Sequence, residues 1–184
     1  MPPHISNYII DVVDVLGDGH CGYRVISNGL EMEDNWLQVR KELSQELQKK
    51  EELYEQIFGK VRGLELLDSL DCVVVPAPLD KWMTMPDMGL IIASCYNIKL
   101  VHFSMFQYFT FLPLHSPLPV LQRTIYMRFI QGNHFVRLCM RDDCPLPPTI
   151  SIWGRYHEEL AEKWYKFNYI LHMYFLLIHM LCES

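Results

Sequence analysis

A glycine-rich loop runs into a predicted helix in the stretch Asp14-Val15-Leu16-Gly17-Asp18-Gly19-His20-Cys21-Gly22-Tyr23-Arg24-Val25-Ile26-Ser27. Gly17 and Gly19 permit backbone conformations that other residues avoid, and apolar residues recur at helical spacing after Cys21. We therefore expect Cys21 in the first turn of the helix, where unpaired amides and the helix dipole would lower the pKa of its thiol. The backbone amides of Gly19 and Cys21 form the expected oxyanion hole for acyl transfer.

Composition limits the classes to which the chain can belong. It has 184 residues, half of them apolar, so it can bury one substantial core, and one domain with a tail is expected. The net charge of −6 gives no electrostatic support for binding nucleic acid. We expect no nucleic-acid partner, and a basic protein partner suits the charge better.

The six cysteines predict neither a metal site nor a disulfide scaffold, because they are spread along the chain without a Cys-x-x-Cys pair. The N-terminus, Met1-Pro2-Pro3-His4, lacks the basic start and apolar core of a signal peptide. These two features predict an intracellular location, in the cytosol or the nucleus. No metal or organic cofactor is implied.

Apolar periodicity and turn residues predict an alternation of strands and helices. A short strand over Tyr8–Val13 leads into the glycine-rich loop that precedes Cys21, which we call the cysteine loop. A long helix that starts at Asp34 or Asn35 continues to Phe58. The sequence further predicts a brief buried strand over Asp71–Val75, a helix between Thr84 and Asn97, and strands over Ile98–Ser104 and Tyr108–Leu112.

A hairpin follows, formed by Thr124–Ile130 and His134–Met140 with the three-residue connection Gln131-Gly132-Asn133. His134 therefore opens a strand beside a tight turn. A cysteine early in the chain and a histidine much later on a strand have the order of a papain-like thiol protease. In such an enzyme the imidazole takes the thiol proton and later returns it to the leaving amine.

Asp18-Gly19-His20-Cys21, followed by Tyr23-Arg24, resembles the nucleophile motif of the ovarian-tumour (OTU) family of papain-like cysteine proteases, most of which are deubiquitinases. The usual family form is D-G-N-C-L-F-R, so His20 replaces an asparagine and Gly22 a larger apolar residue. His20 is expected either to donate to the oxyanion, as the family asparagine does, or to be an exposed loop residue without a role. The residues around Trp82 are most similar to OTU domains found near transposon-derived sequences.

The resemblance covers about Val12 to Met140 and implies an α+β, papain-like OTU fold with a small mixed sheet packed between helices. It implies that Cys21 is the nucleophile and His134 the general base. Ubiquitin or a ubiquitin-like modifier is the implied partner.

The third catalytic residue is open, because many family members place a carboxylate or amide two residues after the histidine, where this chain has Val136. Asn133, Asp18, Asp14 and Asp11 are the available substitutes. Asp18 is the aspartate expected in the site, since it lies within the family motif, and Asn133 is a weaker candidate for orienting the imidazole. A purely structural Asp18, bonded to nearby backbone amides in its turn, is an equal alternative.

The segment from Pro145 onward changes character, so we predict an OTU-like domain over residues 1–144 and a linker with an apolar helical tail over 145–184. The apolar run from Tyr169 to Cys182 is 14 residues long, whereas a membrane span needs about 20. Three alternatives stand for the tail: a helix docked on the domain or on a partner, a frayed end, and a tail anchor in a membrane.

Taken together, these features predict a thiol isopeptidase that removes ubiquitin or a related modifier from proteins. One alternative is a catalytically weak or inactive OTU-like module that binds ubiquitin or another protein, for which Val136 is the telling feature. Another is an intracellular structural module left by a mobile element.

Overall fold

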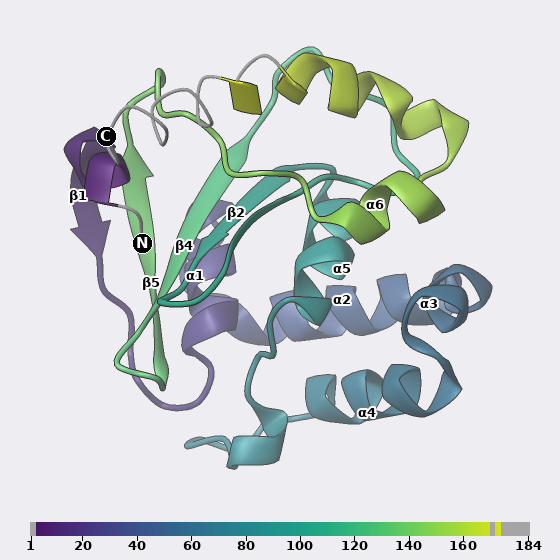
Figure 1. The fold of residues 1–184 in the computed structure, drawn as a ribbon. Helices are drawn as coiled ribbons and strands as arrows, with labels where there is room; N and C mark the ends of the chain where they lie inside the picture. Colours follow the sequence, from purple (N-terminus) through teal and green to yellow (C-terminus); the bar gives the residue numbers. More distant parts are fainter. Residues whose placement is uncertain (1–2, 170–171, 174–184) are drawn as a thin grey trace.

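The structure, a computed structural model, describes residues 3–169 together with 172 and 173 (Figure 1). Its centre is a five-stranded sheet with the strand order β1-β5-β4-β2-β3. The strands are β1 (Ile9–Val13), β2 (Lys99–Phe103), β3 (Tyr108–Phe111), β4 (Thr124–Ile130) and β5 (His134–Met140). β2 and β4 pair in parallel, and the other neighbours are antiparallel. The predicted α+β class with a mixed sheet is confirmed, as is the hairpin of β4 and β5.

Most of the helices lie between β1 and β2 in the chain. They are α1 (Cys21–Gly29), α2 (Trp36–Lys49), α3 (Glu51–Phe58), α4 (Lys60–Leu70), α5 (Asp87–Tyr96) and α6 (Ser151–Tyr156). Short 3-10 helices are η1 (Pro3–Tyr8), η2 (Leu79–Lys81) and η3 (Glu159–Ala161), and residues 162–169 are helical. α1 and α5 lie against one face of the sheet, and α2 packs on both of them (Figure 1).

Side chains alternate between the two faces of the strands, and both faces are covered. On the helical face, Ile125 and Met127 of β4 join the main core with the buried residues of α1, α2 and α5. On the other face, Val136 and Leu138 of β5 form a second core with Ile5 and with the segment around Leu146. β2 is consequently buried at each of its five residues.

The segment after residue 144 contributes large side chains to the main core. Trp153 and Trp164 are 2% and 0% exposed, and their indole N–H groups donate to the carbonyls of Pro113 at 2.9 Å and Ser116 at 3.1 Å. The described part of the predicted tail therefore packs on the domain, whereas most of the apolar run over 169–182 lies outside the described residues. No helix within the described ranges is long and apolar enough to cross a membrane. The division at residue 144 stays a prediction.

The predicted strand over Asp71–Val75 is wrong. This segment has no strand partner, and Val73, Val74 and Val75 are 68%, 61% and 55% exposed. The reason is its place in the fold: it follows α4 on the helical side of the molecule, away from the edges of the sheet. Its backbone contacts the cysteine loop instead, since the Val74 carbonyl accepts from His20 Nε2 at 2.9 Å.

The predicted long helix to Phe58 is divided in the structure. Lys50 leaves helical geometry between α2 and α3, which lets the buried Tyr54 turn back and donate its hydroxyl to Glu46 of α2 at 2.9 Å. Gly59, with φ of +79°, then separates α3 from α4, a helix that the sequence pattern did not predict. The apolar residues of α4 that pack inward are few, chiefly Leu66 and Leu70, so its periodic signal is weak.

Candidate active site

Cys21 is the first residue of α1 and is 5% exposed. The preceding Gly19 has φ of +84°, a conformation that favours glycine, and it lies so close to the next loop that no side chain fits there. A Cβ at Gly19 would be 2.6 Å from Trp82 Nε1 and 2.8 Å from the Ala77 carbonyl oxygen. Trp82 in turn donates its indole N–H to that carbonyl at 3.1 Å. The loop over residues 72–82 therefore supports the cysteine loop directly.

Gly22, where the family motif has a larger residue, also lies in a filled space. A Cβ there would be 2.6 Å from Met83 Sδ and 2.8 Å from Met83 Cβ. Met83 is buried and belongs to the main core. The methionine thus occupies the volume that a larger residue at position 22 would need.

The surroundings of the Cys21 thiol act on its pKa in opposite directions. Backbone amides of Phe135, Gly22 and Cys21 itself face the sulfur and lower the pKa. Burial is the larger effect, and the pKa of the thiol lies above its ordinary value. The expectation that the helix start gives a lowered thiol pKa is therefore wrong for the free protein, because it counted the dipole and left out desolvation.

His134 opens β5 beside a turn in which Gly132 has φ of +76°. β5 packs against α1, and the amide of the next residue, Phe135, faces the Cys21 sulfur, so His134 opens the strand that borders the thiol. A Cβ added at Gly17 would lie 3.6 Å from Nδ1, so the ring also borders the cysteine loop.

Asp14 forms a hydrogen bond with the other ring nitrogen of this imidazole, with 2.7 Å between Asp14 Oδ1 and His134 Nε2. A carboxylate only accepts, so Nε2 carries the proton of this hydrogen bond. This hydrogen bond is the largest of the effects that lower the pKa of Asp14. The side chain of Asp14 is 77% exposed and that of His134 is 17% exposed. Asp14 was one of four possible orienters in the sequence, and its pairing with the histidine is visible only in three dimensions.

Asp18, the aspartate that the motif favours, lies in a different network. Its carboxylate pairs with Arg24 at 2.7 Å and accepts from the His20 amide at 3.1 Å. Arg24 also pairs with Asp34. These bonds fix the loop before α1, and among the described residues Asp18 has no bond to His134.

Asn133 is exposed in the turn before β5, and its backbone amide donates to the Ile130 carbonyl at 3.2 Å. Position 136 offers no acid either, because Val136 is 3% exposed within the second core. Across residues 3–169, 172 and 173, no group of three or more His, Cys, Asp and Glu residues could hold a metal ion.

His20 has neither of the roles expected from the sequence. It is fully buried and stacks on Trp36 with 3.6 Å between ring centroids. Its Nε2–H donates to the Val74 carbonyl at 2.9 Å, while Nδ1 accepts from Arg40 Nε at 3.1 Å. Burial lowers the pKa of His20, which favours this neutral state. Both ring nitrogens are occupied, so neither is free to donate to an oxyanion.

Solved structures share this arrangement of elements. The Hazara virus OTU bound to ubiquitin matches with a TM-score of 0.51 and 14% identity, over 74% of this chain and 84% of that chain. The viral OTU domain protease from Dera Ghazi Khan virus matches with a TM-score of 0.52 and 13% identity, over 75% and 85%. The chain has the OTU fold. Neither a protein-family model nor a curated protein sequence matches it. At this identity the likeness to the viral OTU domains is one of fold, and it confirms the predicted fold class.

Proposed function

We propose that this chain is a cysteine-type isopeptidase that removes ubiquitin or a ubiquitin-like modifier from proteins. The observation that carries the proposal is the Asp14–His134 pair, 2.7 Å apart, at the start of β5, the strand whose Phe135 amide faces the Cys21 thiol at the start of α1. Ubiquitin as the partner rests on the Hazara virus OTU, whose structure contains ubiquitin. The negative charge of the chain also suits the basic, glycine-terminated tail of ubiquitin.

In the first half of the reaction, His134 Nδ1 takes the proton of the Cys21 thiol while Asp14 accepts the Nε2–H bond and stabilises the imidazolium. The thiolate attacks the carbonyl carbon of the isopeptide bond and forms a tetrahedral intermediate. Its oxyanion is held by loop amides, those of Gly19 and Cys21 in our assignment. Nδ1–H then protonates the leaving lysine amine as the C–N bond breaks, and a thioester remains on Cys21.

In the second half, a water molecule gives a proton to Nδ1 and its oxygen attacks the thioester carbon. The C–S bond breaks, the modifier leaves with a free carboxylate, and the proton on Nδ1 returns to the Cys21 sulfur. Asp14 keeps the same imidazole nitrogen directed at the thiol through both halves. Asp18 contributes in this scheme by fixing the loop through its bonds to Arg24 and to the His20 amide.

A catalytically weak or inactive OTU-like module that binds ubiquitin is the second candidate. Two observations favour it: burial raises the pKa of the Cys21 thiol, and the orienting carboxylate of Asp14 is mostly in solvent. A thiol with a raised pKa forms little thiolate in the free protein, so cleavage would depend on the proton transfer to His134. The intracellular location and the likeness to transposon-associated OTU domains stay predictions.

Incubation with a ubiquitin probe that carries a thiol-reactive group at its C-terminus tests the proposal. We expect a covalent adduct on Cys21, detected by mass spectrometry, that is lost in Cys21→Ala and retained in Cys95→Ala. Tight binding without an adduct would establish the second candidate. A chain that neither binds nor reacts with the probe would contradict both.

A further inference from the structure

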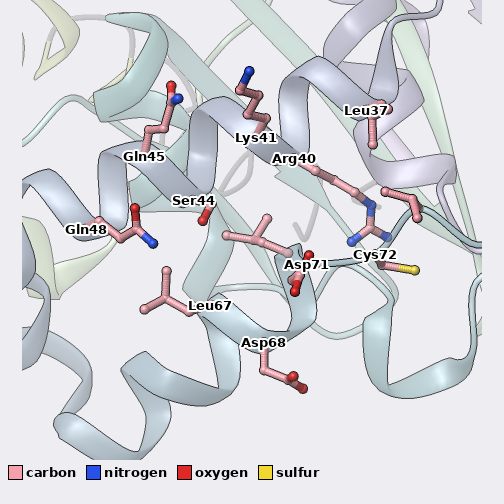
Figure 2. Close-up of a pocket in the computed structure, with 12 residues that line it drawn as sticks. Leu37, Arg40, Lys41, Ser44, Gln45, Gln48, Leu67, Asp68, Asp71 and Cys72 are labelled. Carbon is pink, nitrogen blue, oxygen red and sulfur yellow. The ribbon is translucent and has the colours of Figure 1, made fainter.

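Arg40 of α2 is a buried cation that joins three separate segments. It is 1% exposed, and its guanidinium donates to His20 Nδ1 at 3.1 Å, to the Ser69 carbonyl at 2.7 Å and to the Lys81 carbonyl at 2.8 Å. It also lies over the Tyr23 ring, 3.8 Å from the centroid. Figure 2 shows the side chain extending from α2 toward the segment with Asp71 and Cys72, at the end of a groove of about 670 Å³.

No carboxylate pairs with Arg40 in the described part of the chain, which is unusual for a buried charge. Burial lowers its pKa, in keeping with the desolvation that the site imposes. The compensation comes from two carbonyls, a ring nitrogen and an aromatic face. These acceptors suit the flat, forked guanidinium and could not all be reached by the compact ammonium of a lysine.

The acceptors of Arg40 belong to the segments that surround the cysteine loop. His20 directly precedes Cys21, and its other ring nitrogen donates to Val74 in the loop over 72–82. Ser69 lies near the end of α4, just before that loop, and Lys81 lies near the end of the loop. The same loop carries the Ala77 carbonyl and the Trp82 ring that press on Gly19. The Arg40 side chain thus connects His20, the residue before Cys21, with the loop over residues 72–82.

We propose that Arg40 is a positioning residue for Cys21, acting through His20 and the loop over residues 72–82. The bond from Arg40 to Nδ1 and the bond from Nε2 to Val74 hold the His20 ring on both sides. The fixed ring in turn fixes the backbone turn from Gly19 to Cys21, which places the thiol and the oxyanion amides. The inference rests on the proposed isopeptidase function for its effect on turnover. Its effect on the loop is independent of that function.

A double-mutant cycle tests the coupling. Arg40→Met removes the donors and keeps the stem, and His20→Leu removes both ring bonds and keeps an apolar side chain of similar reach. We expect each change to lower kcat for a ubiquitin substrate by about 10- to 100-fold, with KM within about twofold, because small displacements of reacting groups are costly. The double variant should lose no more than the worse single variant, since both changes break one connection. Multiplied losses, or an unchanged kcat in Arg40→Met, would overturn the proposal.

Tyr54→Phe is the matched control, because it breaks another buried hydrogen bond to α2, that between Tyr54 of α3 and Glu46. At an equal loss of Tm, Tyr54→Phe should leave kcat within about twofold of the wild type. If it lowers kcat as much as Arg40→Met, Arg40 is merely structural. Arg40→Lys, which keeps the charge, replaces Arg40→Met if the latter does not fold, and the same losses are expected.

Hydrogen exchange separates this inference from the proposed function. Arg40→Met should speed amide exchange in residues 17–21 and 72–82 by about tenfold or more and leave β4 and β5 unchanged, because only local opening becomes easier. If exchange becomes faster in this way but the wild type has no isopeptidase activity, Arg40 positions the loop and the proposed function is wrong. If the wild type is active but the variants change neither exchange nor kcat, the proposed function stands and the positioning role of Arg40 is wrong.

Discussion

Two histidines in the described part of the chain bond a carboxylate at nearly the same distance. His134 Nε2 lies 2.7 Å from Asp14, and His115 Nε2 lies 2.6 Å from Glu46. Their surroundings differ: the Asp14 side chain is 77% exposed, whereas that of Glu46 is 8% exposed and also accepts from the Tyr54 hydroxyl. A histidine bonded to a carboxylate is therefore not by itself a sign of catalysis. The buried pair ties α2 to two other segments.

Each pair belongs to an element that lies close to a cysteine, and the groups around the two thiols differ. Cys95 lines the same groove as Glu46, and burial together with Glu46 and Glu42 raises the pKa of its thiol to about 12. Cys21 is also buried, and Asp18 raises the pKa of its thiol as well, but three backbone amides face its sulfur and lower that pKa. A carboxylate directed at a thiol opposes the thiolate, whereas one placed behind an imidazole supports proton transfer from the thiol. What faces the sulfur distinguishes the candidate site from the structural cluster.

The largest difference should appear on removing each cysteine. Cys21→Ala should lower the rate of ubiquitin cleavage by more than about a thousandfold, because no other group can form the thioester. Cys95→Ala should retain activity. Steady-state kinetics with a ubiquitin substrate, together with calorimetric affinities for ubiquitin, check both. Substantial cleavage by Cys21→Ala would remove it as the nucleophile.

A carboxylate added at position 136 tests whether Asp14 already completes the first pair. Val136→Asp should lower the free energy of unfolding by about 3 kcal/mol or more, since the side chain is 3% exposed in the second core. The rate of cleavage should not rise. Urea unfolding and kinetics measure the two effects, with Val136→Ala as the control for lost volume. A stably folded variant with a higher kcat would show that His134 lacks an orienter in the wild type.

A third histidine shows what burial does without a carboxylate. His102 is 5% exposed, its Nε2 has no hydrogen-bond partner among the described residues, and burial lowers its pKa from 6.5 to about 4. The unfolded chain then binds the proton more tightly, so stability is full above pH 6.5 and falls as the pH drops toward 4. The expected loss from this group is about 3 kcal/mol.

Urea unfolding at pH 7 and pH 4.5 measures this slope. His102→Leu should show a weaker dependence on pH than the wild type over that interval, because the titrating group is gone. Other lowered pKa values, such as that of His20, act in the same direction and remain in both proteins. Equal slopes would show that His102 keeps an ordinary pKa in the folded chain.

The smallest expected effects come from neutralising the two acids. Asp14→Asn should lower kcat by about 10- to 100-fold with little change in Tm, because the imidazole loses its orienter at an exposed position. Glu46→Gln should leave kcat unchanged and lower stability by about 1–3 kcal/mol, because it weakens a buried network. Kinetics and thermal unfolding of both variants measure the two effects. A large loss of kcat in Glu46→Gln together with an unchanged kcat in Asp14→Asn would show that the catalytic and structural roles of the two pairs are assigned the wrong way round.

Local sequence patterns account for much of the fold. The alternation of apolar residues and the Gln131-Gly132-Asn133 turn predict the hairpin of β4 and β5, and the register places His134 at its start. Asn97 ends α5 in the left-handed conformation that its position predicts. These features depend on neighbours within a few residues, so composition and spacing are sufficient to indicate them. The cysteine and the histidine are likewise marked by the loop and the strand to which they belong.

Contacts between distant segments could not be predicted in this way. The bond from Asp14 to His134 joins residues 120 positions apart, and the sequence motif favoured Asp18 over Asp14. His20 looks like an exposed loop residue until α2 brings Arg40 and Trp36 to it. The sequence by itself predicted most of the strands and helices from local periodicity and turn chemistry, and its resemblance to the OTU motif indicated the class of fold and the two residues of the candidate dyad. Only the tertiary structure decided which acid meets the imidazole and how deeply the thiol is buried, because desolvation and pairing depend on every segment that packs around them.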